Sequence, residues 1–367
     1  MNIFTGSFNI NGVLLDAETA KAWLEPAADC QVAALGFQEC RHIPVQAFPA
    51  PNVSGEHTES VDCYLRGGNP SEDAEFVQLL SAALPHLVLV SDVAMGEPPT
   101  GGKVTTEGPN TEWYGTLRLL LFVKEGFFDS APIIQSWVIP AGNKASSFAS
   151  AMGHYAPGRS PDKGGVALYL QQAKLLLVNC HLYGTNEHGV GEIKFDAIRL
   201  RQLQDIEQAL LPVSVDTDLC TVVFGDLNYR VEIHSAGPDK VKGGKDWEAV
   251  VNICRGGTLE SLQDLYKHDR LSQLLQSELC PRILKGCEDG LRRSLEDEGV
   301  AVMPTFTYKP GAAHPREYAI KRTPSWTDRV LVRSPAQGVV CWLLPFESVR
   351  EIAISDHEPV RAVLTRQ

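Results

Sequence analysis

The sequence has little of what marks secreted, membrane-spanning or nucleic-acid-binding proteins. Its first residues lack the basic and long apolar regions of a signal peptide, and no apolar run reaches transmembrane length. The last four residues do not form a prenylation box. The 33 Lys and Arg residues are outnumbered by 45 Asp and Glu residues, giving a net charge of −12. This balance disfavours non-specific binding to nucleic acid, so we expect a cytoplasmic protein whose only membrane contact is peripheral.

Several common motifs and boundaries are also absent. The nine cysteines have no paired metal-type spacing, so we interpret them as reduced, mostly structural thiols. The glycine-lysine segments at 101–103 and 243–245 lack the spacing of a phosphate-binding loop. No internal repeat or long Pro/Ser linker divides the 367 residues. We therefore expect a single domain over residues 1–367 and a monomeric protein.

What the sequence does contain is a series of short apolar runs typical of strands, with helical patterns between them. The predicted strands are 32–37, 87–90, 117–123, 165–170, 175–179, 221–224, 330–332, 339–344 and 360–364. Predicted helices open at Asn69-Pro70, cover 193–211, and fill a long region over 247–297. Loops are predicted at 97–110 and 141–162. This pattern fits a doubly wound sheet or two packed mixed sheets, and composition does not choose between them.

Two segments in the C-terminal half carry the strongest functional signal. Residues 224–230 (FGDLNYR) follow an apolar run, so a buried strand would deliver Asp226 and Asn228 to its tip. A carboxylate and a carboxamide on one side of the pleat can hold a water molecule between them. Residues 322–330 (RTPSWTDRV) place Asp328 at the start of another apolar strand.

Further polar side chains lie at or just beyond apolar runs, as they would at the edge of a sheet. They are Asn9 and Asn11, which alternate and would share a face, then Glu39, His181, Asp356 and His357. Phosphate-monoester hydrolysis needs a cation, a positioned water and donors to the phosphoryl oxygens. Each requirement has a candidate here, and the hard oxygen ligands suit Mg²⁺.

Taken singly, these residues have more ordinary explanations. An Asp-x-Asn after a strand is usually a turn or a helix cap, and a strand-end histidine is usually structural. Asp328 and Asp356 are ordinary candidates for ion pairs. Six such signals along one chain favour the catalytic interpretation.

In order and in residue type, the motifs resemble those of the inositol polyphosphate 5-phosphatases, a branch of the endonuclease/exonuclease/phosphatase superfamily. The resemblance covers nearly the whole chain and includes residues 162–167 (DKGGVA) and 303–306 (MPTF). It implies an α/β four-layer sandwich, two packed mixed β-sheets flanked by helices, as in deoxyribonuclease I. It also implies Mg²⁺-dependent removal of the 5-phosphate from inositol polyphosphates or from phosphoinositides such as phosphatidylinositol 4,5-bisphosphate.

The resemblance further implies roles for individual residues. Asp226, helped by Asn228, would orient and deprotonate the attacking water. His357, held by Asp328, and His181 would donate hydrogen bonds to the phosphoryl oxygens.

The resemblance assigns the remaining candidates to metal and substrate. The metal ligands would be Glu39, with Asn9, Asn11 and Asp356 in or beside the same coordination shell. The substrate-binding residues would be Lys163, Arg230, Tyr308, Lys309, Lys321 and Arg322. Arg230, like Arg329, is also well placed to brace the loops.

Two departures from the family pattern concern specificity. Thr307 and Ile320 stand where the family has lysines that contact the 4-phosphate of the inositol ring. Lys309 and Lys321 lie nearby in the sequence, so we expect that they substitute through a shifted loop or that the phosphate preference is altered.

Two other functions compete with the phosphatase interpretation. A nuclease of the same superfamily shares the metal and water machinery, but the Trp-Thr-Asp-Arg segment and the acidic charge disfavour it. A catalytically silent binding domain has no need to keep Glu39, Asp226, Asn228 and His357 together. The sequence does not distinguish lipid from soluble substrates, and it leaves open a larger parent protein.

Overall fold

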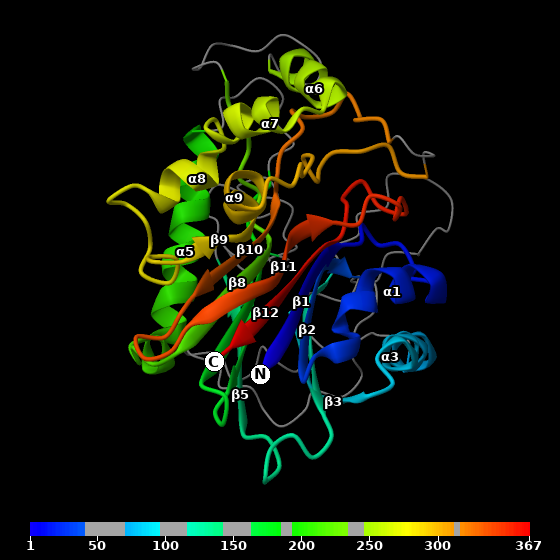
Figure 1. Cartoon of the computed structure of the whole chain (residues 1–367), viewed down its shortest axis with the longest axis vertical. Helices are drawn as coiled ribbons and strands as arrows, with labels where there is room; N and C mark the ends of the chain where they lie inside the picture. The colour runs from blue at the N-terminus through cyan, green and yellow to red at the C-terminus, as the bar shows by residue number, and fades with distance from the viewer. Residues whose placement is uncertain (41–69, 96–115, 142–162, 185–192, 234–245, 312–315) are drawn as a thin grey trace, which may run out of the picture.

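The computed structural model describes residues 1–40, 70–95, 116–141, 163–184, 193–233, 246–311 and 316–367. These residues form two six-stranded sheets packed face to face, with helices on both outer sides (Figure 1). The prediction of two packed mixed sheets is therefore confirmed, and the doubly wound alternative is excluded.

Each sheet contains one parallel pair of central strands. The first sheet has the order β11-β12-β1-β2-β4-β3, and the second has the order β5-β6-β7-β8-β10-β9. The pairs β1–β2 and β7–β8 are parallel, and all other neighbours are antiparallel. The strands are β1 (Asn2–Asn9), β2 (Val32–Cys40), β3 (Leu87–Met95), β4 (Thr116–Lys124), β5 (Ile134–Pro140), β6 (Gly164–Leu170), β7 (Leu175–His181), β8 (Cys220–Asp226), β9 (Glu288–Asp289), β10 (Asp328–Arg333), β11 (Val340–Ser348) and β12 (Val360–Arg366).

Every predicted strand is present, whereas β1, β5, β9 and the helix α1 (Ala17–Leu24) were not predicted. Helix α3 (Pro70–Ala83) begins at the predicted proline, and α5 (Ile193–Ser214) continues beyond its predicted end. The predicted loop at 97–110, the predicted cap Asn69 and all but the first residue of the predicted loop at 141–162 lie outside the described residues.

The predicted helical region over 247–297 contains several short helices, interrupted by the strand β9 and by a non-helical stretch. It divides into α6 (Trp247–Gly256), α7 (Leu259–Tyr266), α8 (Arg270–Leu275), β9, α9 (Gly290–Arg292) and the π-helical turn η2 (Arg293–Asp297). Gly257, with a left-handed φ of 60°, ends α6. The side chains of Thr258 and Asp269 then cap the next two helices, so each new helix starts from its own polar residue.

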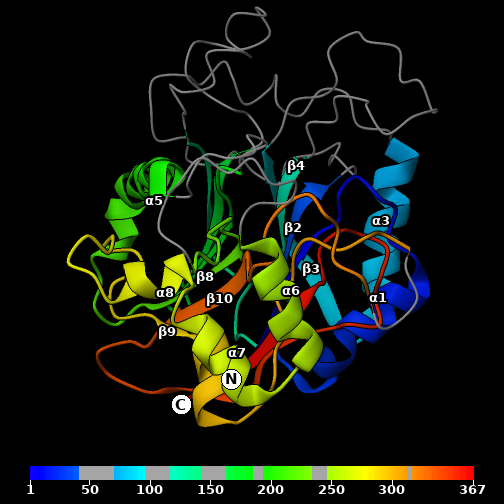
Figure 2. The same ribbon diagram turned by 90° about the horizontal axis from the view of Figure 1, so that it is seen from above.

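The apolar residues form three layers. One fills the space between the sheets, and includes Ile3, Val32, Leu177 and Val222. A second joins the outer face of the first sheet to α1, the 3-10 helix η1 (Glu25–Asp29) and α3, and a third joins the outer face of the second sheet to α5 and α8 (Figure 2). Among the described residues, no helix combines the length and apolar character that crossing a membrane requires.

A buried ion pair ties β10 to the short helices. Arg329 is fully buried, and its guanidinium contacts Asp289 and donates from Nη1 to Asp269 Oδ2 at 2.8 Å. Both carboxylates are buried as well, and Asp289 also accepts a hydrogen bond from Tyr266 Oη at 2.7 Å. The buried charges of Arg329, Asp269 and Asp289 therefore depend on one another for neutralisation.

We predict that Arg329→Leu lowers the free energy of unfolding by about 3–5 kcal/mol, because it leaves two buried carboxylates without their cation. Urea denaturation would measure this. Arg333→Leu is the matched control, because Arg333 lies on the same strand but is only partly buried, and we expect a smaller loss. Equal losses in the two variants would contradict the special role of the buried pair.

Candidate active site

The candidate site lies at the polar end of the space between the two sheets. Along β1, the inward-facing side chains change from apolar Ile3 to polar Thr5, Ser7 and Asn9. The same change occurs on β2, β7 and β8, which end near Gln38, His181 and Asp226. β10 begins at Asp328, directly opposite Asp226 in the strand register, and His181 is opposite Asp226 on the other side. Strand alternation therefore brings the predicted strand-end side chains to one edge.

Asp226 is at the centre of this edge and is almost completely buried. Its Oδ2 accepts from Asn9 Nδ2 at 3.1 Å, and its Oδ1 accepts from the backbone N–H of Asn228 at 3.0 Å. His181 Nε2 is 3.5 Å away, and His357 Nε2 is 3.9 Å away. Burial raises the pKa of Asp226, and Asp328 raises it further, while His357 lowers it. A carboxylate with a raised pKa is a better proton acceptor near neutral pH.

His357 forms a buried pair with Asp328. Its Nδ1 is 2.9 Å from Asp328 Oδ2, which also accepts hydrogen bonds from Thr305 Oγ1 at 2.7 Å and Thr327 Oγ1 at 2.9 Å. Burial lowers the pKa of His357, but the charge of Asp328 and its hydrogen bond outweigh burial and raise it to about 9. His357 is therefore a cation at neutral pH, with Nε2 turned toward Asp226.

His181 is surrounded by charges of both signs. Its Nε2 is 2.5 Å from Lys163 Nζ and 3.8 Å from Glu39 Oε1. The predicted candidates Lys163, His181, Glu39 and Asp226 are thus brought together. The side chains of Lys163 and His181 could contact a phosphate, and the carboxylates of Glu39 and Asp226 could contact a metal ion.

The direction of the Glu39 side chain depends on a break in the β2 strand. Regular alternation would place Glu39 on the outer face with Phe37, whose ring packs against Trp23 and Phe76. Glu39 instead has a left-handed φ of 50°, and the pairing of β2 with β4 shifts register between Phe37 and Cys40. Such backbone exceptions are typical of functional sites.

Two groups of side chains are candidates for a metal ion. Asp226, Asp328 and His357 have ligand atoms within 4.8 Å of one another. However, Asp328 Oδ2 accepts three hydrogen bonds, one of them from His357 Nδ1, so an ion there would have only Asp328 Oδ1 open and would face the cationic His357 ring. The Glu39 side fits a cation better. Burial raises the pKa of Glu39, Lys163 and His357 lower it, and the carboxylates of Asp356 and Asp226 raise it again, so a bound cation would offset the repulsion among these carboxylates.

The other predicted metal ligands differ in position. Asn9 Oδ1 accepts from the backbone N–H of Asn11 at 3.1 Å, which still leaves one lone pair for an ion. Asp356 is partly exposed beside His357. The expectation that Asn9 and Asn11 share a face is wrong, because β1 ends at Asn9 and Asn11, with φ of 48°, has an exposed side chain.

Asn228 and Arg230 brace the loop that follows β8. Asn228 Nδ2 donates to the carbonyl of Leu182 at 3.0 Å, and its Oδ1 accepts from Arg230 Nη2 at 2.6 Å. The buried guanidinium of Arg230 also lies 4.4 Å from the centre of the Phe306 ring. Phe306 in turn packs on the His357 ring, so Arg230 supports His357 through the Phe306 ring.

The predicted substrate-binding residues of the 306–325 segment point in different directions. Tyr308 is buried, and its hydroxyl contacts Tyr318 Oη and donates to the carbonyl of Pro304 at 2.8 Å. Its position gives no support to a substrate contact. Lys309 is exposed and pairs with Glu317, Lys321 is exposed, and Arg322 lies 5.8 Å from the Phe306 ring centre.

Three functional hydroxyls were missed from the sequence. Thr305 and Thr327 hold Asp328, and Ser355 Oγ both donates to the carbonyl of Asn9 at 2.7 Å and accepts from the His357 N–H at 3.2 Å. Thr327 directly precedes Asp328 and Ser355 is two residues before His357, so this adjacency was the available signal.

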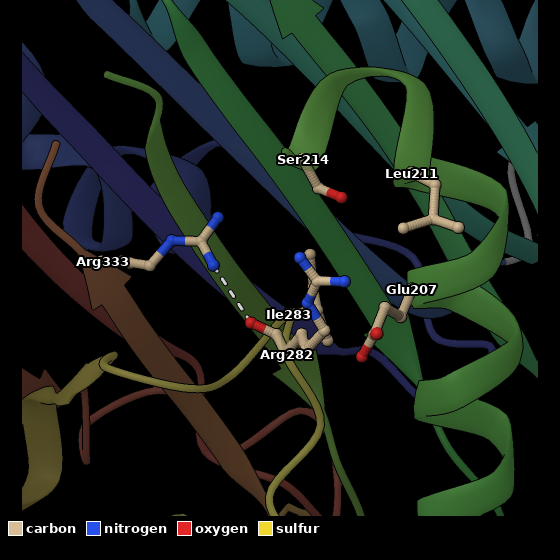
Figure 3. Close-up of a pocket in the computed structure, with 6 residues that line it drawn as sticks. All are labelled: Glu207, Leu211, Ser214, Arg282, Ile283 and Arg333. Atoms are coloured by element: carbon tan, nitrogen blue, oxygen red, sulfur yellow. Dashed lines mark hydrogen bonds between the residues drawn. The ribbon is translucent and has the colours of Figure 1, made fainter. Parts of the chain in front are cut away.

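A small cavity of about 50 Å³ lies at the other end of the second sheet, where Arg333 is opposite Thr221 (Figure 3). Glu207, Arg282 and Arg333 are among its lining residues. Arg333 Nη1 donates to the carbonyl of Arg282, and Nη2 donates to Thr221 Oγ1, each at 3.0 Å. These donors are used within the protein, and the cavity is separate from the candidate site.

The comparisons with known proteins agree with the site. The model of endonuclease/exonuclease/phosphatase family 2 matches residues 6–363, so the chain belongs to this family. The chain is 29% identical over 205 residues to type IV inositol polyphosphate 5-phosphatase 11 of Arabidopsis thaliana, covering 55% of this chain and 52% of the plant protein. It is 27% identical over 219 residues to type II inositol 1,4,5-trisphosphate 5-phosphatase of Mus musculus, covering 59% and 19% of the two chains. The chain thus spans about half of the plant relative and less of the mouse relative.

Solved structures share the fold. The inositol polyphosphate 5-phosphatase domain of synaptojanin, in complex with inositol (1,4)-bisphosphate and calcium ion, matches with a TM-score of 0.60 and 20% identity, covering 99% of this chain and 83% of that one. Cimex nitrophorin in its ferrous NO complex matches with a TM-score of 0.58 and 16% identity, covering 100% and 98%. Because the fold accommodates both, function has to be argued from the site residues. The resemblance to the inositol polyphosphate 5-phosphatases is confirmed by the relatives.

The raised pKa of His357 predicts a pH-dependent stability. The folded-state pKa of about 9 exceeds the ordinary value of 6.5, so the pair stabilises the fold fully below pH 6.5 and loses this contribution as pH rises through about 9. In Asp328→Asn, we expect the His357 pKa to fall to its ordinary value or below, because burial then dominates. NMR titration of the His357 ring in metal-free protein would measure this, with exposed Asp216→Asn as the control. A pKa that stays near 9 in Asp328→Asn would refute the pairing argument.

Proposed function

We propose that this chain is a Mg²⁺-dependent phosphatase that removes the 5-phosphate from inositol polyphosphates or phosphoinositides, acting as a single catalytic domain. The observation that carries the proposal is the convergence of Asp226, His181 and the His357–Asp328 pair within hydrogen-bonding reach of one small volume beside Glu39. The family membership of the chain and the printed functions of its relatives support the same substrate class.

In this proposal, Asp226 accepts the proton of the attacking water. The hydrogen bonds from Asn9 and from the Asn228 backbone fix the orientation of its carboxylate. Its raised pKa makes proton transfer from water less unfavourable than for an exposed aspartate.

His357, His181 and Lys163 would hold the phosphoryl oxygens. His357 is cationic because of Asp328, so it offers a charged Nε2–H donor without a change in protonation during the reaction. Lys163 contacts His181 and adds a second positive charge beside it. Such donors act most strongly when they are fixed in place before the substrate arrives.

Glu39 would hold the Mg²⁺ ion, with Asp356 and Asn9 beside it. The ion, when bound, would neutralise the negative charge that develops on the phosphoryl and leaving oxygens. The proposed partner is an inositol phosphate or phosphoinositide. Cytoplasmic location, peripheral membrane contact and a monomeric state remain parts of the proposal.

A phosphate-release panel would test the function. It would compare inositol 1,4,5-trisphosphate, phosphatidylinositol 4,5-bisphosphate vesicles and single-stranded DNA, with Mg²⁺ and with chelator. We expect release of the 5-phosphate from inositol substrates only with Mg²⁺. DNA cleavage without phosphate release would favour the nuclease alternative, and inactivity on every substrate would favour a silent binding domain.

We predict that Asp226→Asn lowers turnover by about 10²-fold or more, because the carboxamide cannot accept the proton. Single-turnover phosphate release would measure the change, and circular dichroism would check the fold. Asp216→Asn, at an exposed position, is the matched control and should keep normal turnover. Near-normal turnover in a folded Asp226→Asn variant would show that another group is the base.

We predict that Glu39→Gln raises the Mg²⁺ concentration needed for half-maximal activity by about ten- to a hundredfold, because it removes a charge-assisted contact. Calorimetric Mg²⁺ titration would measure binding independently of activity. Glu347→Gln, whose parent carboxylate pairs with Arg361 instead, is the control. An unchanged metal response would remove Glu39 from the proposed metal site.

A further inference from the structure

A buried carboxamide joins the two sheets directly beneath the candidate site. Asn179 lies on β7, one pleat before His181, and its side chain is fully buried. Its Nδ2 donates to the backbone carbonyl of Arg118 on β4 at 2.8 Å, and it is 3.3 Å from that of Phe37 on β2. Its Oδ1 accepts from Gln38 Nε2 at 2.7 Å. All of these contacts reach from the second sheet to the first.

Two glycines leave space for this carboxamide. A Cβ atom on Gly36 would lie 2.5 Å from the Phe224 ring and 2.7 Å from Asn179 Cγ. A Cβ atom on Gly225 would lie 2.8 Å from Asn179 Oδ1. The first sheet can therefore approach Asn179 closely, because β2 carries no side chain at Gly36.

The contacts of Asn179 are next to the residues of the proposed reaction. Its partner Gln38 directly precedes Glu39, and Asn179 itself precedes His181 by two positions on the same face of β7. Glu39 comes from one sheet and His181 from the other, and their side chains are only 3.8 Å apart. This separation depends on how the two strand ends are held against each other.

We propose that Asn179 is a positioning residue, which sets the distance and register between the sheet that carries Glu39 and the sheet that carries His181 and Asp226. The inference rests on the proposed function for its catalytic consequence. Apolar contacts such as those of Leu177, one pleat deeper, stabilise the packing of the sheets without direction. The hydrogen bonds of Asn179 are directional, so they fix one arrangement of the strand ends.

The test compares Asn179→Leu with Leu177→Ala. Both change a buried inward-facing residue of β7, so both should lower stability. At a temperature where both are folded, we expect Asn179→Leu to lower kcat by about ten- to a hundredfold with KM changed less than about threefold, because small misplacements of reacting groups are costly. Leu177→Ala should keep kcat within about threefold. Equal effects of the two variants on kcat would overturn the proposal.

A glycine pair provides the same test from the other sheet. Gly36→Ala would press on the Phe224 ring at 2.5 Å and on Asn179 at 2.7 Å, whereas Gly6→Ala would press on the Trp23 ring at 2.7 Å, on the outer face of the first sheet. We expect Gly36→Ala to lower kcat as Asn179→Leu does, and Gly6→Ala to leave kcat unchanged. This pair also decides the question if Asn179→Leu does not fold. An unaffected kcat in Gly36→Ala would contradict the proposal.

A readout independent of turnover separates this inference from the proposed function. The NMR signals of the His181 ring should shift in Asn179→Leu and Gly36→Ala, and stay in place in Leu177→Ala and Gly6→Ala. If the parent protein releases no phosphate, the proposed function fails, but the shifts still show whether Asn179 positions His181. Unmoved His181 signals in Asn179→Leu and Gly36→Ala would overturn the positioning role itself.

Discussion

Two carboxylates, Asp226 and Asp328, face each other on paired strands in the interior of the protein, and the site is organised around them. Burying a charge is costly unless donors or opposite charges surround it. The Oδ2 atom of Asp328 accepts hydrogen bonds from two threonine hydroxyls and contacts His357, whose pKa Asp328 raises. Asp226 is held by Asn9 and by the Asn228 backbone. His357 is therefore both the cation that the buried Asp328 requires and the charged donor of the proposed phosphate site.

The space between the sheets has an apolar half, which stabilises the fold, and a polar half, which carries the site residues. One half is apolar and supplies the hydrophobic stabilisation of the sandwich. Around the polar half, buried ion pairs hold the neighbouring elements in place. Arg118 donates from Nε to Asp92 at 2.9 Å and contacts Asp73 at 2.7 Å, which ties β4 to β3 and α3. Rigid surroundings of this kind allow the site residues to be fixed before a substrate binds.

The convergence of Asp226, His181 and Asp328 could be predicted from the sequence. Apolar runs mark the strands, and the alternation of side chains along each strand places these three residues at one edge of the sheet. The backbone exceptions could not be predicted, because the sequence does not show where a strand stops. Glu39 reaches the site through a left-handed conformation, and Asn11 turns outward because β1 has already ended. Tyr308 and the hydroxyls of Thr305 and Thr327 point inward because of tertiary contacts that no local pattern encodes.

A crystal structure of the Asp226→Asn variant with inositol 1,4,5-trisphosphate and Mg²⁺ would show directly how substrate and ion lie in the site. We expect the 5-phosphate between His181 and His357, the ion on the Glu39 carboxylate, and a water molecule against the side chain at position 226. A ligand bound away from these histidines, or an ion held by Asp328 instead of Glu39, would contradict this arrangement.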